Sequence, residues 1–337
     1  MIRELLFAAL VSFLVTAVFG KFLIQKLRAM KAGQSIREDG PVWHMAKQGT
    51  PTMGGLMFII GIGIAVFTIG FPAIRAGRVG HVIVYLFALI YAVIGFLDDY
   101  EKLRKKQNLG LTAVQKFLIQ LVVAIVLVLV LRHLGFLSPN LIIPFTTRTL
   151  FLPEIVYLIF AAFVIVGTVN AVNITDGVDG LVTGVSLPVA MCYGALALFW
   201  GQYYLELGIF AAALTGGLAA FLIYNFNPAK VFMGDTGSLF LGGAVCGLAF
   251  AMNIPLILIP LGVIYIAEVM SDIIQFSYYK ATGGKRFFKM APLHHHFEMG
   301  GWSGKKWSEK KVFTVFTLIS VICSVIAFLS IYMRHGL

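Results

Sequence analysis

The segment PEIVYLIFAAFVIVGTVNAVNITDGVDGLVTGVSLPVAMCYGALALF, residues 153–199, contains two long apolar runs that flank the polar turn NITDGVDG. Each run is close to the ~20 residues with which an α-helix crosses about 30 Å of hydrocarbon. A helix pairs its own backbone polar groups, so it is stable where no water is available. The segment therefore predicts two membrane-spanning helices joined by a turn that carries Asp176 and Asp179.

The rest of the chain repeats this apolar pattern. Of its 337 residues, 59% are hydrophobic and only 12% are charged, which leaves too few polar side chains to cover a soluble domain. We therefore expect an all-α, polytopic integral membrane protein, one membrane domain over residues 1–337 with about ten transmembrane helices. The predicted spans are 3–27, 54–70, 80–97, 117–134, 153–173, 181–199, 204–224, 237–253, 255–279 and 312–333.

The basic residues divide unequally between the two ends of these spans. Most of them follow the first, third, fifth, seventh and ninth spans, so the positive-inside rule places those loops in the cytoplasm and both termini on the extracytoplasmic side. Orientation alone accounts for many of these charges, but the net charge of +11 also favours contact with anionic lipid headgroups or an anionic substrate. The predicted cytoplasmic loops cover about 28–53, 98–116, 174–180, 225–236 and 280–311.

Carboxylates gather in or beside the same loops, which orientation does not require. Carboxylate oxygens are the ligands that divalent cations such as Mg²⁺ prefer, and lysine and arginine bind phosphate. The cytoplasmic face is therefore a candidate site for a phosphate-bearing substrate and a divalent ion.

The motif LDDYEK places Asp98 and Asp99 at the end of the third span, one turn before Lys102. Neighbouring helical residues point about 100° apart, so the two carboxylates are expected to differ in role, one at a metal and the other at substrate. The alternative is a solvated helix end with ion pairs to Lys102.

In NAVNITDGVDG, the residues Asn170, Asn173, Asp176 and Asp179 recur at every third position. They line one row if the helix continues past the membrane boundary, and such a row suits magnesium coordination or hydrogen bonding to a sugar phosphate. The alternative is a loop whose side chains cap the neighbouring helices.

In NPAKVFMGDTGS, Gly234 and Asp235 form a glycine-flanked turn before the eighth span, with Ser238 placed to cap that helix. A helix N-terminus offers free N–H groups to an anion, and Asp235 can hold the anion's magnesium ion. The alternative is a tight turn with a capping serine.

The loop motif APLHHHFE contains three consecutive histidines, 294–296. Zinc sites usually space their ligands, so contact with an anion or a substrate is favoured over a metal site. On the ninth span, Glu268, Asp272 and Gln275 form a polar stripe, which is expected to face protein or a water-filled cleft.

Together, the motifs LDDYEK, NAVNITDGVDGL, NPAKVFMGDTGS, KQGTPTMGG and APLHHHFE resemble those of the polyprenyl-phosphate N-acetylhexosamine-1-phosphate transferases. Within that superfamily the chain is most similar to the phospho-N-acetylmuramoyl-pentapeptide-transferase family, because the histidine loop separates it from relatives that use N-acetylglucosamine. The resemblance spans essentially the whole chain.

The resemblance implies a Mg²⁺-dependent reaction in a bacterial inner (plasma) membrane, with the active site on the cytoplasmic face. Undecaprenyl phosphate would attack the sugar-linked phosphorus of UDP-N-acetylmuramoyl-pentapeptide, release UMP and form lipid I, the first lipid-linked peptidoglycan precursor. The expected partners are these two substrates and membrane lipids, with no nucleic acid, and a homodimer stays open.

The resemblance also completes the list of candidate residues. Asp98, Asp99 and Asp235 are expected to be catalytic, with magnesium held by Asp235 and Asp176. Lys116, Asn225 and Phe232 come from the resemblance alone. The expected substrate-binding residues are Lys47, Thr52, Lys116, Asn170, Asn173, Asp176, Asp179, Asn225, Phe232, Gly234, Ser238, Gln275, His294, His295 and His296.

Two other functions remain as alternatives. A sister transferase that uses UDP-N-acetylglucosamine would share the aspartate motifs and differ mainly in the histidine loop. An ion-coupled transporter would carry acids at mid-bilayer and an inverted repeat, whereas the sequence shows acids gathered mainly at one face and no such repeat.

Overall fold

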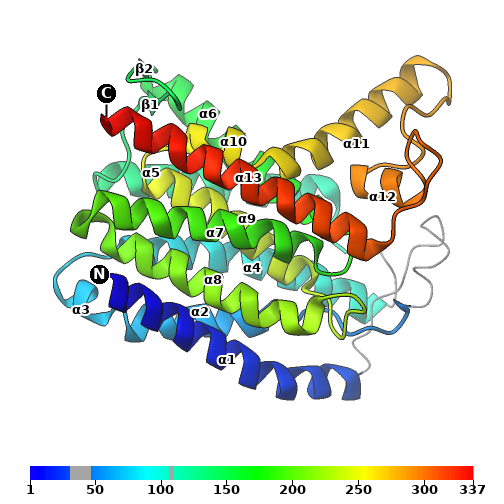
Figure 1. Cartoon of the computed structure of the whole chain (residues 1–337), viewed down its shortest axis with the longest axis horizontal. Helices are drawn as coiled ribbons and strands as arrows, with labels where there is room; N and C mark the ends of the chain where they lie inside the picture. Colours follow the sequence, from blue (N-terminus) through cyan, green and yellow to red (C-terminus); the bar gives the residue numbers. More distant parts are fainter. Residues whose placement is uncertain (31–46, 106–109, 337) are drawn as a thin grey trace.

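The long apolar segments form helices that lie side by side, with both termini at one end and α12 (Leu293–Glu298) at the other (Figure 1). This computed structural model describes residues 1–30, 47–105 and 110–336. Within these ranges, eight helices are long and apolar enough to cross a membrane, which confirms an all-α, polytopic protein. They are α1 (Ile2–Ala29), α4 (Gly80–Lys105), α5 (Ala113–His133), α6 (Glu154–Thr175), α7 (Leu181–Trp200), α8 (Leu205–Asn225), α9 (Gly234–Ala251) and α13 (Glu309–Gly336).

The remaining elements are short, except α11 (Val263–Ala281), which has 19 residues. A two-stranded antiparallel hairpin pairs Asn140 with Phe151 and lies near the C-terminus (Figure 1). The short elements are α2 (Leu56–Thr68), α3 (Phe71–Arg75), η2 (Gln202–Tyr204), η3 (Pro255–Ile257), α10 (Leu258–Leu261), β1 (Asn140–Ile142) and β2 (Thr149–Phe151).

Two predicted spans are not single long helices. The segment 54–70 forms α2, whose 13 residues reach only about 20 Å at 1.5 Å per residue. The segment 255–279 is broken at Gly262, where the helices before and after it meet at 80°. Pro260 cannot donate a backbone hydrogen bond. At the bend, a Cβ on Gly262 would lie 2.6 Å from the carbonyl oxygen of Leu258, so the glycine allows the close turn. The total of about ten spans therefore stays a prediction.

Helix α4 extends further than the sequence indicated, to Lys105 rather than 97. Ion pairs one turn apart, Lys102 to Asp98 and Lys105 to Glu101, sustain the helix beyond its apolar part. Asp98 therefore lies inside a helix and not at its end. Parts of two predicted loops, residues 31–46 and 106–109, lie outside the described residues.

Helix α9 lies at the centre of the bundle and is the most sheltered of the eight long helices. Its most extensive partner is α4, and small residues let the two backbones approach closely. A Cβ added to Gly95 of α4 would lie 2.1 Å from the carbonyl oxygen of Asp235, and one added to Gly243 would lie 3.1 Å from the Cα of Ala88. The glycines thus hold the polar end of α4 against the first turn of α9.

The chain before α2 fixes the same turn from the other side. Phe232 N donates to Pro51 O at 2.8 Å, and Gly54 N donates to Phe232 O at 2.8 Å. A Cβ on Gly55 would lie 2.2 Å from the Cα of Gly237, so α2 and α9 also meet backbone to backbone. Three segments distant in sequence therefore position the start of α9.

We predict that Gly95→Ala destabilises the protein by about 1–3 kcal/mol, because the added methyl group overlaps the backbone at Asp235. The thermal unfolding temperature of the detergent-solubilised protein measures this. Gly167→Ala in α6 is the matched control, because a Cβ at Gly167 meets nothing within 4 Å. Equal unfolding temperatures for the two variants would contradict the close approach.

Candidate active site

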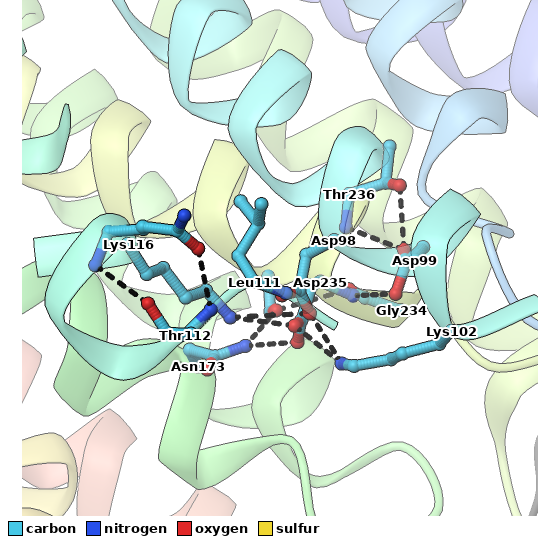
Figure 2. Close-up of polar contacts among 12 residues, drawn as sticks. Asp98, Asp99, Lys102, Leu111, Thr112, Lys116, Asn173, Gly234, Asp235 and Thr236 are labelled. Carbon is cyan, nitrogen blue, oxygen red and sulfur yellow. Dashed lines mark hydrogen bonds and ion pairs between the residues drawn. The ribbon is translucent and has the colours of Figure 1, made fainter. Parts of the chain in front are cut away.

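Three carboxylates converge where α4 meets α9 (Figure 2). Asp98, Asp99 and Asp235 each place one oxygen within 4.8 Å of the others. Asp98 and Asp99 are buried, at 2% and 4% exposure, although both are charged residue types. Such a group requires cations or hydrogen-bond donors, because buried like charges repel one another strongly.

Asp99 meets this requirement by capping α9. Its carboxylate accepts hydrogen bonds from the backbone N–H of Asp235 (3.1 Å) and of Thr236 (2.9 Å), and from the Thr236 hydroxyl (2.7 Å). These N–H groups belong to the first turn, where a helix has no internal acceptors. The cap was expected from Ser238, which instead lies inside α9 and donates to Gly234 O at 3.1 Å. That expectation was wrong.

Asp98 and Asp235 instead share two lysines. Lys102 Nζ lies 2.6 Å from Asp98 Oδ2 and 2.8 Å from Asp235 Oδ2, and Lys116 Nζ lies 2.7 Å from Asp235 Oδ2. The alternative interpretation of LDDYEK limited Lys102 to ion pairs within its own helix. Lys102 also contacts Asp235 on α9, so its role is wider than that. The second oxygen of Asp98 accepts from Leu111 N at 2.8 Å. The two adjacent aspartates thus have different surroundings, as their helical positions predict.

The row of residues in NAVNITDGVDG is divided, because α6 ends at Thr175. Asn173 Nδ2 donates to Asp235 Oδ1 at 2.8 Å and to Ser238 Oγ at 2.7 Å. Asn170 Nδ2 donates to Gln120 Oε1 at 2.6 Å, on another helix. The condition for a single row, a helix that continues past this boundary, is therefore not met.

Asp176 lies in the turn after α6, close to the three aspartates but outside their 4.8 Å group. Loss of water contact raises the pKa of the Asp176 carboxyl well above its usual range, and nearby negative charges, Asp235 first, raise it further. A cation near this turn would oppose that effect.

Asp179 belongs to a second charged cluster. Lys47 Nζ lies 2.7 Å from Asp179 Oδ1 and 2.6 Å from Glu309 Oε2. Asn227 Nδ2 donates to both carboxylates at 3.1 Å, and Ala229 N donates to Asp179 Oδ2 at 2.9 Å. Sequence reasoning missed Glu309 and Asn227. An acid at the start of the last apolar helix, inside a lysine-rich loop, was the available signal.

The other residues expected from KQGTPTMGG and NPAKVFMGDTGS surround the start of α9. Gly234 has a φ of 70°, and a Cβ there would lie 2.5 Å from Asp99 Oδ2 and 2.8 Å from the buried Thr52 hydroxyl. Phe232 is half-buried in the same segment. Asn225 is buried and accepts from the Thr183 hydroxyl and donates to Val231 O, so its amide supports the fold.

The histidine loop contacts the turn after α6. His294 Nδ1 lies 2.9 Å from Glu268 Oε2 on α11, and both side chains are buried. A Cβ on Gly177 would lie 2.2 Å from His294 Nε2, so only glycine fits beside that ring. The loop thus reaches the residue next to Asp176.

The remaining histidines and Gln275 stabilise the loop itself. His295 Nδ1 lies 2.7 Å from Glu298 Oε2, and His296 Nδ1 accepts from Lys289 N at 3.1 Å. Gln275 Oε1 accepts from the backbone N–H groups of residues 287 and 288, so the polar stripe of α11 faces protein as expected. Among the described residues, the histidines do not join a metal-ligand group.

Burial alone would lower the pKa of His294, but the Glu268 carboxylate outweighs it and raises that pKa above its usual 6.5. Because the folded-state pKa is raised, the charged pair adds stability below the unfolded value and loses it as pH rises through the folded value.

We therefore predict that Glu268→Gln destabilises the protein more at pH 6 than at pH 9, with a loss of unfolding free energy of roughly 1–3 kcal/mol at the lower pH. Unfolding of the detergent-solubilised protein across this range measures the effect. Glu101→Gln removes a partly exposed acid that is ion-paired to Lys105, and it should give no such pH dependence between pH 6 and 9. If the stability that Glu268→Gln loses relative to the unmodified protein were the same at every pH, His294 would not be charged in the folded protein.

Comparison with known proteins identifies the family. Residues 81–253 match the model of glycosyl transferase family 4, and residues 47–59 match signature 1 of phospho-N-acetylmuramoyl-pentapeptide-transferase. The chain is 45% identical to the enzyme of that name from Caldanaerobacter subterraneus subsp. tengcongensis, over 98% of this chain and 100% of the relative. It is 44% identical to that from Clostridium acetobutylicum, over 97% and 99% of the two chains.

These matches include the residues of the site. The family model contains all three clustered aspartates, and the signature contains Lys47 and Thr52. The relatives' similarity extends over nearly the whole chain and so includes the histidine loop. The chain therefore belongs to the family of phospho-N-acetylmuramoyl-pentapeptide-transferases.

Proposed function

We propose that this chain transfers phospho-N-acetylmuramoyl-pentapeptide from UDP-N-acetylmuramoyl-pentapeptide to undecaprenyl phosphate, releasing UMP and forming lipid I. The observation that carries the proposal is the group of Asp98, Asp99 and Asp235 with Lys102 and Lys116, in a chain that belongs to this family. Phosphoryl transfer depends mainly on positioning and on stabilising negative charge, which carboxylate-bound metal and lysines supply.

The donor set of the cluster fits magnesium. Mg²⁺ prefers carboxylate oxygens and keeps several waters, so it needs only one or two carboxylates from the protein. We assign the ion to Asp235, with Asp176 as a further contributor from the neighbouring turn, and Asp99 is engaged in capping α9. When bound, the ion would neutralise charge that develops on the transferring phosphate.

The residues of the chain then have distinct tasks. Lys102 and Lys116 have flexible side chains that can move from Asp235 to phosphate oxygens when the anionic substrates enter. Asp98 orients the acceptor or shares the metal. A phosphate monoester has a second pKa near ~6, so the acceptor is mostly dianionic at neutral pH and attacks without a general base. We therefore favour a single in-line displacement.

The remaining expectations concern place and specificity. We propose a bacterial plasma membrane with the cluster on the cytoplasmic side, because the basic loops lie at the same end as the cluster. Lys47, Thr52, Asn173, Asp179 and the histidine loop would contact the donor. A homodimer is an expectation from the resemblance.

The function is tested with purified protein, a polyprenyl phosphate and Mg²⁺, offered either UDP-N-acetylmuramoyl-pentapeptide or UDP-N-acetylglucosamine. UMP release with the first donor only is expected, and release from the second only would favour the sister transferase.

His295→Ala should raise KM for the donor roughly 10-fold with little change in kcat, because a binding contact is lost. Lys305→Ala, an exposed change in the same loop, is the control. An unchanged KM and selectivity would give the histidine another role.

We predict that Asp235→Asn lowers turnover roughly 10²-fold or more, as expected when one oriented stabilising group is removed. It should also abolish the rise in unfolding temperature that Mg²⁺ causes in the unmodified protein, since ligand binding stabilises the folded state. Glu101→Gln, which changes an acid near the end of α4 but outside the cluster, should change neither measurement. Near-normal turnover with an intact Mg²⁺ response would rule out Asp235 as the ligand.

A further inference from the structure

A cavity of about 560 Å³ lies at the opposite end of the bundle from the aspartate cluster. It opens among the end of α7, the start of α8 and the ends of α9 and α13, which Figure 1 places near the termini and β1. None of its lining residues belongs to the candidate active site. The lining residues that matter here are Phe136, Trp200, Tyr203, Tyr204, Glu206 and Arg334.

Glu206 gives the cavity a carboxylate that the fold leaves incompletely paired. The side chain is only 4% exposed, yet its Oε2 accepts no hydrogen bond among the described residues. The nearest cation, Arg78, lies 3.8 Å away and donates to Gln202 O at 2.9 Å. A buried carboxylate is costly unless a cation or donor accompanies it, so this one is suited to a positively charged ligand.

Aromatic residues line the same cavity as this carboxylate. Trp200 and Tyr204 have ring centroids 4.7 Å apart at 40°, and Tyr203 is 90% exposed. Aromatic faces attract cations, and aromatic cages are a common means of binding ammonium groups. Trp and Tyr also gather at the membrane–water interface, which places this cavity at headgroup level.

Arg334 supplies the opposite charge in the same cavity. Its Nη1 donates to Arg148 O at 3.1 Å, which leaves other guanidinium donors for an anion. The cavity therefore has one carboxylate with aromatic neighbours and one guanidinium. This combination complements a ligand that has both an ammonium and a phosphate.

We propose that this cavity binds the zwitterionic headgroup of a membrane phospholipid, with the ammonium against Glu206 and the aromatic rings and the phosphate near Arg334. An anionic headgroup has no ammonium group, so it would leave the Glu206 carboxylate without a cationic partner. A lipid tail alone would bury that carboxylate without a partner. The site is separate from the proposed transferase reaction.

The test measures lipid retained by the purified protein, using native mass spectrometry after incubation with equal amounts of phosphatidylethanolamine and phosphatidylglycerol of identical acyl chains. The unmodified protein should retain several-fold more phosphatidylethanolamine. Glu206→Gln should lose most of this several-fold preference, because the amide keeps the shape but not the charge. UMP release by this variant should be unchanged.

The control is Glu154→Gln. Glu154 lies at the start of α6, outside the cavity, and is ion-paired to Arg132. Tyr203→Ser is a second test variant that changes an exposed ring and is expected to fold normally; it should weaken the preference. Equal retention of the two lipids by the unmodified protein, or a Glu206→Gln variant as selective as Glu154→Gln, would overturn the proposal.

Discussion

The site depends on the backbone contact between α4 and α9 at Gly95. Because no side chain separates the helices there, the next turn of α4 brings Asp99 to the free N–H groups of α9. Those N–H groups have no acceptors inside their own helix, and Asp99 supplies them across the interface. The same contact places Asp98 beside Asp235. One steric constraint therefore determines both the cap and the carboxylate cluster.

The charges of the cluster show how a membrane protein can hold acids together without substrate. Asp98 and Asp235 share Lys102 and Lys116, and Asp179 and Glu309 share Lys47. Lys102 and Lys47 therefore each contact two carboxylates, and Lys116 contacts a carboxylate that Lys102 also contacts. Such pairs lower the cost of burying the acids, and they keep phosphate-binding cations at the place where anionic substrates would arrive.

Much of the fold and the identity of the clustered aspartates followed from sequence, because length and hydropathy largely determine membrane helices. Contacts between helices did not follow. The capping role of Asp99 depends on a partner in another helix, and the polarity of Asn170 does not reveal that it faces Gln120. The break at Gly262 was missed because the segment remains apolar across it. The composition of a segment indicates whether it is buried, but it does not show which neighbouring helix each side chain faces.

The composition of α9 follows from its central place. It contacts protein on nearly every side and is accordingly the least apolar of the eight long helices, rich in glycine and alanine. Small residues favour close packing against other helices but give little free energy of transfer into lipid. During biosynthesis, α9 alone is therefore a weak insertion signal. Its entry into the bilayer is therefore expected to depend on the earlier helices against which it packs most extensively, α4 and α6.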